Sequence, residues 1–256
     1  MEQPYPVYRV SAVSYANTLP FVYGLRHAPG RPEIELSIDI PSECAMRLKS
    51  KEADIGLVPV AALPSMEYYE IIPGYCLGAD GPVRSVMLFS SVPAEKIQKI
   101  YLDPQSRTSN NLVRILARDF WHISPAWEMA PDDDSYLTVE EGGGRVLIGD
   151  RAFYAESAYP WCYDLAAMWK EFTSLPFVFA VWAANTRVHP IFVQKFNSAL
   201  QYGIMHIPEA AASLHNERLH KTINLENYLL SNLSYPLDNA KMAAIKMFLD
   251  MLRSFQ

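Results

Sequence analysis

The feature that most constrains the fold is an alternation of strand and helix patterns in the first sixty residues. Residues 8–15, 34–38 and 53–60 show the alternating or continuously apolar pattern of strands, and residues 21–26 and 41–51 have helical spacing. Strands joined in this way by helices are parallel, because the crossover returns the chain to the edge where it started. The pattern predicts an open α/β sheet with a ligand crevice beyond the carboxyl ends of its strands.

A second α/β unit is predicted after a break at Ser91-Val92-Pro93. Its strands are expected at 97–102 and 145–149 and its helix at 106–120, and an apolar run at 177–183 returns the chain to the first unit. With 256 residues, the chain is long enough for two lobes. We expect lobe one from residues 1–90 plus 185–256, and lobe two from residues 91–184.

Two discontinuous lobes joined by two hinge crossovers are the plan of the two-lobed periplasmic-binding-protein-like (type II) fold. In such a fold a small ligand is held in the cleft between the lobes and enclosed by hinge closure. Architecture of this kind does not by itself state a function, so the function has to be argued from the loops that face the cleft.

Charge and cysteine content narrow the class of protein. The 22 basic and 28 acidic residues leave a net charge of −6 without a basic run, which argues against nucleic acid as a partner. Cys44, Cys76 and Cys162 are isolated, and the six histidines have no metal-ligand spacing, so neither disulfides nor a metal site are expected. The first residues resemble no export signal and no apolar run could span a membrane, so we expect a cytoplasmic protein without membrane contact.

The strongest local signal for a binding site is the run Ser106-Arg107-Thr108-Ser109, which follows a predicted strand and opens a helix. A helix N-terminus has free N–H groups and a positive dipole end, hydroxyl side chains add donors, and Arg107 can offer a planar fork to a carboxylate. This predicts an anion site. The alternative is an ordinary helix cap formed by Ser106 or Thr108.

Other polar residues occupy the corresponding loops. Asn17 and Ser14 follow the first strand and Ser42 follows the second, where each could bind a ligand or cap a helix. Ser85 either faces the cleft or is simply a polar strand position. Gly149-Asp150 ends a lobe-two strand, where the carboxylate could act as a base or cap the next helix.

Five motifs occur in an order that resembles one known family: VSYANTLP (13–20), ADIGLVPV (53–60), SRTS (106–109), IGD (148–150) and LPFVFA (175–180). Together they resemble the chorismate dehydratase family of the futalosine route to menaquinone, which has the two-lobed fold expected above. The resemblance implies removal of water from chorismate to give 3-[(1-carboxyvinyl)oxy]benzoate. It also implies that the anion-binding loops hold the two carboxylates of chorismate.

The resemblance favours Asn17 and Arg107 as the leading site residues, followed by Ser85, Ser106, Thr108 and Ser109. Loss of the ring hydroxyl and a neighbouring proton makes the ring aromatic and requires no cofactor. We expect the enolpyruvyl carboxylate of the substrate to take the proton while Asn17 orients it, with Asp150 as the rival base. The alternatives are the dihydroxynaphthoate synthase of the same pathway and a non-catalytic binding protein for a small carboxylate. The chain could act as a monomer or a homodimer.

Overall fold

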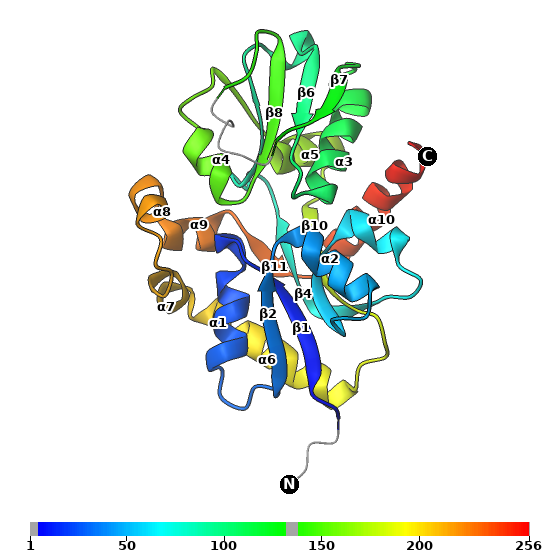
Figure 1. Ribbon diagram of the computed structural model, residues 1–256, viewed down its shortest axis with the longest axis vertical. Helices are drawn as coiled ribbons and strands as arrows, with labels where there is room; N and C mark the ends of the chain where they lie inside the picture. Colours follow the sequence, from blue (N-terminus) through cyan, green and yellow to red (C-terminus); the bar gives the residue numbers. More distant parts are fainter. Residues whose placement is uncertain (1–4, 132–137, 256) are drawn as a thin grey trace.

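The computed structural model describes residues 5–131 and 138–255 and shows two lobes, each built on its own β-sheet (Figure 1). The expectation of a cytoplasmic protein rests in part on residues 1–4. These residues lie outside the described part of the chain. No helix in the described part of the chain is both long and apolar enough to cross a bilayer.

The first sheet contains six strands within the described residues, in the order β11-β4-β10-β3-β1-β2. β1 pairs in parallel with both β2 and β3, as the alternation of strands and helices predicts, whereas β10 is antiparallel to β3 and β4. The strands are β1 (Tyr8–Val13), β2 (Ile34–Asp39), β3 (Ile55–Pro59), β4 (Glu70–Ala79), β10 (Phe177–Ala184) and β11 (Ser234–Pro236).

The second sheet contains five strands within the described residues, in the order β7-β6-β8-β5-β9. β6 is parallel to β7 and β8, and β5 is antiparallel to β8 and β9. The strands are β5 (Val86–Ser90), β6 (Lys99–Leu102), β7 (Ala126–Met129), β8 (Gly143–Ile148) and β9 (Trp161–Asp164).

The two crossovers lie earlier than the sequence suggests. The expected boundaries at 90/91 and 184/185 would leave β5 in lobe one and β10 in lobe two, but β5 belongs to the second sheet and β10 to the first. The chain therefore changes sheet between Ala79 and Val86 and again between Asp164 and Phe177. The misleading signal is Pro93, which looks like a boundary but only starts the short turn η3 (Ala94–Lys96) inside lobe two.

Helices surround both sheets (Figure 1). The C-terminal helix α10 packs against β10 and reaches α3 of the other lobe. The α-helices are α1 (Leu19–His27), α2 (Pro41–Lys49), α3 (Arg107–Ile115), α4 (Asp150–Ala155), α5 (Leu165–Thr173), α6 (Pro190–Met205), α7 (Ile207–Ala212), α8 (Glu217–Thr222), α9 (Leu225–Ser231) and α10 (Asn239–Arg253). The shorter turns are η1 (Ala16–Thr18), η2 (Val60–Ser65) and the π-helical η4 (Leu116–Phe120), which continues α3.

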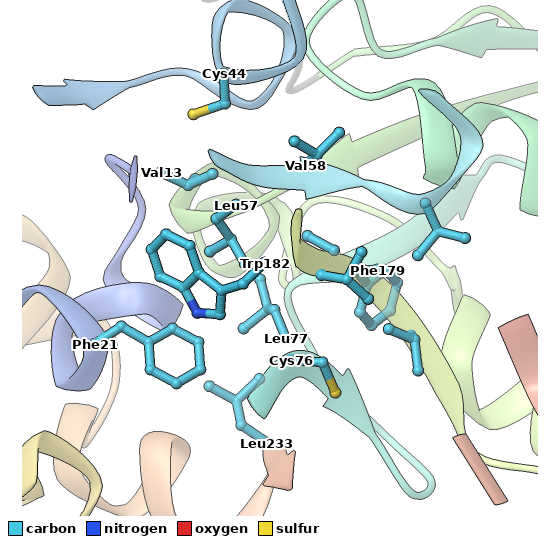
Figure 2. Packing of buried hydrophobic residues seen from close by; sticks show 14 of the residues in the cluster. Val13, Phe21, Cys44, Leu57, Val58, Cys76, Leu77, Phe179, Trp182 and Leu233 are labelled. Carbon is cyan, nitrogen blue, oxygen red and sulfur yellow. The ribbon is translucent and has the colours of Figure 1, made fainter. Parts of the chain in front are cut away.

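The core of lobe one is centred on β10, whose eight residues are all buried. Its Trp182 packs edge-on against Phe21 of α1 at 5.8 Å between ring centroids and against Phe196 of α6 at 5.0 Å. Figure 2 shows Trp182 and Phe21 beside one another, with Leu57 and Leu77 from the flanking strands close by. Helices on both faces of a strand bury both sets of its side chains, which explains why this segment is apolar throughout.

Candidate functional site

A cleft of about 450 Å³, its open mouth included, lies where the carboxyl ends of β1 and β3 face the loops that follow β6 and β8. Its walls are mostly apolar: Val13, Pro41, Pro59, Leu77, Val86, Ile148, Phe179 and Ala180. The remaining lining residues are Tyr15, Asn17, Ser106, Thr108, Ser109 and Gly149.

Among the lining residues that the structure describes, none has a basic or acidic side chain. The positive potential comes from helix starts instead. α2 begins at the lining residue Pro41, and α3 begins directly after the lining residue Ser106. The Ser109 N–H donates to the Ser106 hydroxyl at 3.1 Å. In the first turn of α3, the N–H groups of Arg107 and Thr108 therefore remain without a partner inside the helix. Such helix ends favour anionic groups.

Asn17 is held at the end of β1 by the turn η1. The Thr18 hydroxyl fixes this turn by donating to the carbonyl oxygens of Val13 at 2.6 Å and Tyr15 at 2.8 Å. The Asn17 side chain is 7% exposed and lines the cleft, and its Oδ1 is buried without a hydrogen-bond partner. A buried acceptor without a partner costs about 1–3 kcal/mol, which a donor on a ligand could recover.

The three hydroxyl residues at the start of α3, Ser106, Thr108 and Ser109, all line the cleft, and Ser106 also caps the helix. Ser106 is the N-cap, as the alternative interpretation expected, and it also lines the cleft. Thr108 joins the lobes, because its hydroxyl donates to the Phe179 carbonyl at 3.1 Å and accepts from the Ala61 N–H at 3.2 Å. Ser109 is buried and lines the cleft.

Four of the expected binding residues lie outside the cleft lining, and three of them, Arg107, Ser14 and Ser42, belong to the loops around α2 and α3. Arg107 is exposed, so its guanidinium is not placed where a carboxylate fork was expected. Ser14 is also exposed, and its backbone N–H donates to the Asp39 carbonyl. Ser42 is half-buried in the first turn of α2, next to the lining residue Pro41. The first turns of α2 and α3 thus approach the cleft without these three side chains.

Gly149 allows the two lobes to approach closely. Its φ is +62°, and a Cβ at this position would lie 3.0 Å from the Tyr15 ring. Its N–H donates to the Ser85 carbonyl at 2.8 Å. A side chain here would therefore push Tyr15 out of the cleft wall as well as strain the backbone.

Asp150 is not among the cleft-lining residues, although Gly149 beside it is. Its Oδ1 accepts a hydrogen bond from the Ala16 N–H at 3.3 Å, which links α4 of lobe two to η1 of lobe one. Burial raises the pKa of Asp150, and the Ala16 hydrogen bond opposes the rise. In this structure the Asp150 carboxylate therefore holds the two lobes together and does not face the cleft.

Sequence reasoning missed the residues that support the site. The Tyr15 hydroxyl donates to Gln105 Oε1, and burial raises its pKa. Asp103, whose side chain is 0% exposed, accepts from Arg151 at 2.9 Å and from the Ile148 N–H at 3.2 Å. Burial raises the pKa of Asp103, while Arg151 and the backbone donors oppose the rise. Asp103 lies in the loop before the hydroxyl run, but its partner Arg151 is 48 residues away, so no local sequence pattern could indicate the pair.

Ser85 is buried at the entrance to lobe two, and its hydroxyl accepts a hydrogen bond from Tyr228 of α9 at 2.7 Å. It does not line the cleft directly. In the part of the chain that the structure describes, no cluster of three or more histidine, cysteine, aspartate or glutamate side chains could hold a metal ion.

A family model described as menaquinone biosynthesis matches residues 8–254. The chain belongs to this family. The match includes every part of the cleft, from β1 in lobe one to the C-terminal helices, so the menaquinone biosynthesis assignment applies to the two-lobed unit as a whole.

Two curated relatives of this menaquinone biosynthesis protein carry the name chorismate dehydratase. The one from Thermus thermophilus is 28% identical over 259 residues, covering 93% of this chain and 92% of the relative. The one from Campylobacter jejuni is 28% identical over 173 residues, covering 66% of this chain and 63% of the relative.

Solved structures with the same architecture confirm the predicted periplasmic-binding-protein-like fold. A protein from Archaeoglobus fulgidus matches with a TM-score of 0.73 at 17% identity, covering 96% of this chain and 97% of that one. The alkanesulfonate-binding protein of Xanthomonas axonopodis pv. citri matches with a TM-score of 0.66 at 13% identity, covering 99% and 93%. At these identities the similarity establishes the fold alone.

Proposed function

We propose that this menaquinone biosynthesis protein is a chorismate dehydratase, which removes one water from chorismate to give 3-[(1-carboxyvinyl)oxy]benzoate. The observation that carries the proposal is the cleft itself: apolar walls suited to a six-membered ring, helix N-termini suited to carboxylates, and an unpartnered amide oxygen at Asn17. The two relatives named chorismate dehydratase support the choice of substrate.

The two carboxylates of chorismate would bind at the first turns of α2 and α3. The N–H groups of Arg107 and Thr108 are free to donate there, and the Ser106 and Ser109 hydroxyl groups lie beside them. The apolar residues Leu77, Val86 and Phe179 would pack against the ring and its enolpyruvyl group. Binding of this kind positions a dianion without a lysine or arginine side chain.

The reaction breaks one C–H and one C–O bond of the ring, and the proton and hydroxide leave together as water. Among the described lining residues no aspartate, glutamate or histidine is available as a base, and burial raises the pKa of Tyr15. We assign the enolpyruvyl carboxylate of the substrate as the base: it takes the ring proton and passes it to the departing hydroxide, so that water leaves and the carboxylate is regenerated. The Asn17 Oδ1 would accept from the ring hydroxyl and orient it. Apolar walls that exclude water would favour this transfer.

Asp150 remains the rival base, and one substitution separates the two assignments. Asp150→Asn keeps an oxygen that can accept from the Ala16 N–H. If the substrate supplies the base, turnover of Asp150→Asn stays within about threefold of the wild type. A loss of about 100-fold with unchanged affinity would instead assign proton removal to Asp150.

The function is tested by incubating the purified protein with chorismate in the presence of a chelator and without nucleotide. Chromatography with mass detection follows the loss of one water. Conversion, abolished or strongly reduced by Asn17→Ala, supports the proposal. Chorismate that raises the melting temperature but is recovered unchanged would indicate a binding protein. Chorismate that neither binds nor reacts would favour the dihydroxynaphthoate synthase of the same pathway.

A further inference from the structure

Tyr15 joins the two walls of the cleft. It follows β1 of lobe one, and its hydroxyl donates to Oε1 of Gln105, which follows β6 of lobe two. Both residues are half-buried, and Tyr15 lines the cleft. The hydrogen bond therefore crosses from one lobe to the other beside the place where a ligand would lie.

Two further contacts next to this bond join the same lobes. The bare backbone of Gly149, at the end of β8, lies against the Tyr15 ring, because a Cβ there would be 3.0 Å from the ring. The next residue, Ala16, donates its N–H to Asp150 Oδ1 at 3.3 Å. Two consecutive residues of lobe one thus contact both lobe-two loops that face the cleft, the loop after β6 and the loop after β8.

The Tyr15–Gln105 bond lies away from the two crossovers between the lobes. The crossovers lead from β4 to β5 and from α5 to β10, whereas β3 separates β1 from β10 and β8 separates β6 from β5. The Thr108 hydroxyl, in contrast, bonds to Phe179 in the crossover strand β10 itself. Closure of two lobes is a rotation about the crossovers. Opening would therefore separate Tyr15 from Gln105 further than it separates Thr108 from Phe179.

The chemistry of the bond suits a contact that forms and breaks. Tyr15 and Gln105 are both uncharged and accessible to water, so each can bond to solvent when the lobes separate. A buried ion pair at this place would resist opening, because separation would leave an uncompensated charge.

The two helix starts that face the cleft lie on opposite lobes. α2 begins at Pro41 in lobe one, and α3 begins after Ser106 in lobe two. A ligand with two anionic groups can reach both helix starts only at one separation of the lobes. Contacts that fix this separation therefore position the ligand without touching it.

We propose that the hydrogen bond between Tyr15 and Gln105 is a latch, which holds the two lobes together over a bound ligand. The two residues are positioning residues, because they act through the placement of the lobes. The effect on chorismate and its product rests on the proposed function, in which each carboxylate occupies one helix start. The latch itself does not depend on the identity of the ligand.

The first test measures the distance between the lobes by double electron–electron resonance. Spin labels are attached to Glu35→Cys in β2 and Met129→Cys in β7, in a Cys162→Ser background. Both positions are exposed and lie on the outermost strands of the two sheets. Cys44 and Cys76 are buried and remain unlabelled.

Tyr15→Phe keeps the ring against Gly149 and removes the hydroxyl. Without ligand, the ratio of long to short label distances should rise about fivefold over the wild type, as for the loss of one neutral hydrogen bond. Gln105→Leu breaks the same bond from lobe two and should give the same shift, so it decides the question should Tyr15→Phe not fold. Unchanged distances in a folded variant would overturn the proposal.

Tyr101→Phe is the matched control. Tyr101 is also half-buried, and its hydroxyl donates to Glu140 Oε1 at 3.1 Å, but both residues belong to lobe two. Its removal should leave the label distances unchanged. An equal shift in Tyr101→Phe would show that loss of any such hydroxyl loosens the protein, and would contradict the latch. Thermal unfolding checks that each variant folds.

Ligand affinity provides a second readout. The product 3-[(1-carboxyvinyl)oxy]benzoate is titrated by calorimetry into the unlabelled wild type, Tyr15→Phe, Gln105→Leu and the double variant. Each single variant should bind about fivefold more weakly than the wild type. The double variant should bind no more weakly than either, because both substitutions break the same bond. Losses that add in the double variant would contradict the latch.

The two readouts separate the latch from the proposed function. If chorismate is not converted and the product does not bind, the proposed function fails, while the label distances still decide the latch. If the product binds but the label distances respond to neither Tyr15→Phe nor Gln105→Leu, the latch is wrong and the proposed function stands.

Discussion

The fully buried carboxylate of Asp103 and the partly buried guanidinium of Arg151 form an ion pair at 2.9 Å, next to the start of α3. The same carboxylate accepts from the backbone N–H groups of Gln105 and Ile148, so it ties the loop before α3 to the end of β8. Both segments contribute to the cleft wall. The ion pair therefore supports the backbone that would bind the substrate, although neither side chain lines the cleft.

Asp103→Ala should lower the free energy of unfolding by about 3–5 kcal/mol, because it removes a fully buried carboxylate that accepts from two backbone N–H groups and pairs with Arg151. Chemical denaturation measures this loss. The control is Glu156→Ala, which breaks the ion pair with Arg84, in which both side chains are about half exposed, and should cost at most about 1 kcal/mol. Equal losses in the two variants would show that burial does not set the contribution of the Asp103 pair.

Gly149→Ala should destabilise the protein by about 1–3 kcal/mol and reduce turnover, because a positive φ and the Tyr15 ring both oppose the added methyl group. Gly30→Ala separates the two causes. Gly30 has a similar φ of +69° but nothing within 4 Å of the added Cβ. The difference between the two losses measures the contact with Tyr15, and equal losses with normal turnover would remove that contact from the account of the cleft.

Burial of Asp150 predicts the sign of a pH dependence of stability. Its pKa is raised in the folded protein by burial, so the native state binds the proton more tightly than the unfolded chain does. The associated stability is complete below the unfolded pKa and is lost as the pH rises through the folded pKa. Asp150→Asn removes this titration. Its stability relative to the wild type should therefore increase between acidic and neutral pH in paired unfolding curves, and a constant difference would contradict the raised pKa.

Much of the fold could be predicted because strand and helix periods are local. The continuously apolar stretch at 177–183 indicated a central strand, and β10 is buried along its whole length. The sheet to which β5 belongs could not be predicted, because five buried residues in a row fit a central position in either sheet. Partners distant in sequence leave no local pattern either, and Tyr228 lies 143 residues from Ser85.

The site was predicted in part for the same reason. Ser106 and Ser109 are three residues apart at a helix start, so they lie on one face, and both line the cleft. Arg107 is turned about 200° from Ser109 around the helix axis, and its side chain is exposed to solvent. The residue types predicted a binding loop that the structure places at the cleft, and the angular position of each residue on α3 decides which side chains line it.

Arg107 offers a direct test of binding through the backbone. Arg107→Ala keeps the N–H group and removes an exposed side chain, so affinity for the product 3-[(1-carboxyvinyl)oxy]benzoate should change less than about threefold. Arg107→Pro removes the N–H group. Proline is compatible with the first position of a helix, and Ser106 before it is already extended at φ −127° and ψ 110°.

Titration calorimetry with the product should show an affinity about tenfold weaker for Arg107→Pro, as for the loss of one charge-assisted hydrogen bond. Thermal unfolding of Arg107→Pro without ligand should stay close to that of Arg107→Ala, since proline at this position breaks no intrahelical bond. A large loss of affinity in Arg107→Ala would place the guanidinium over the ligand, as the motif first suggested. Equal affinities in all three proteins would move the carboxylate away from α3 and leave the first turn of α2 as its binding site.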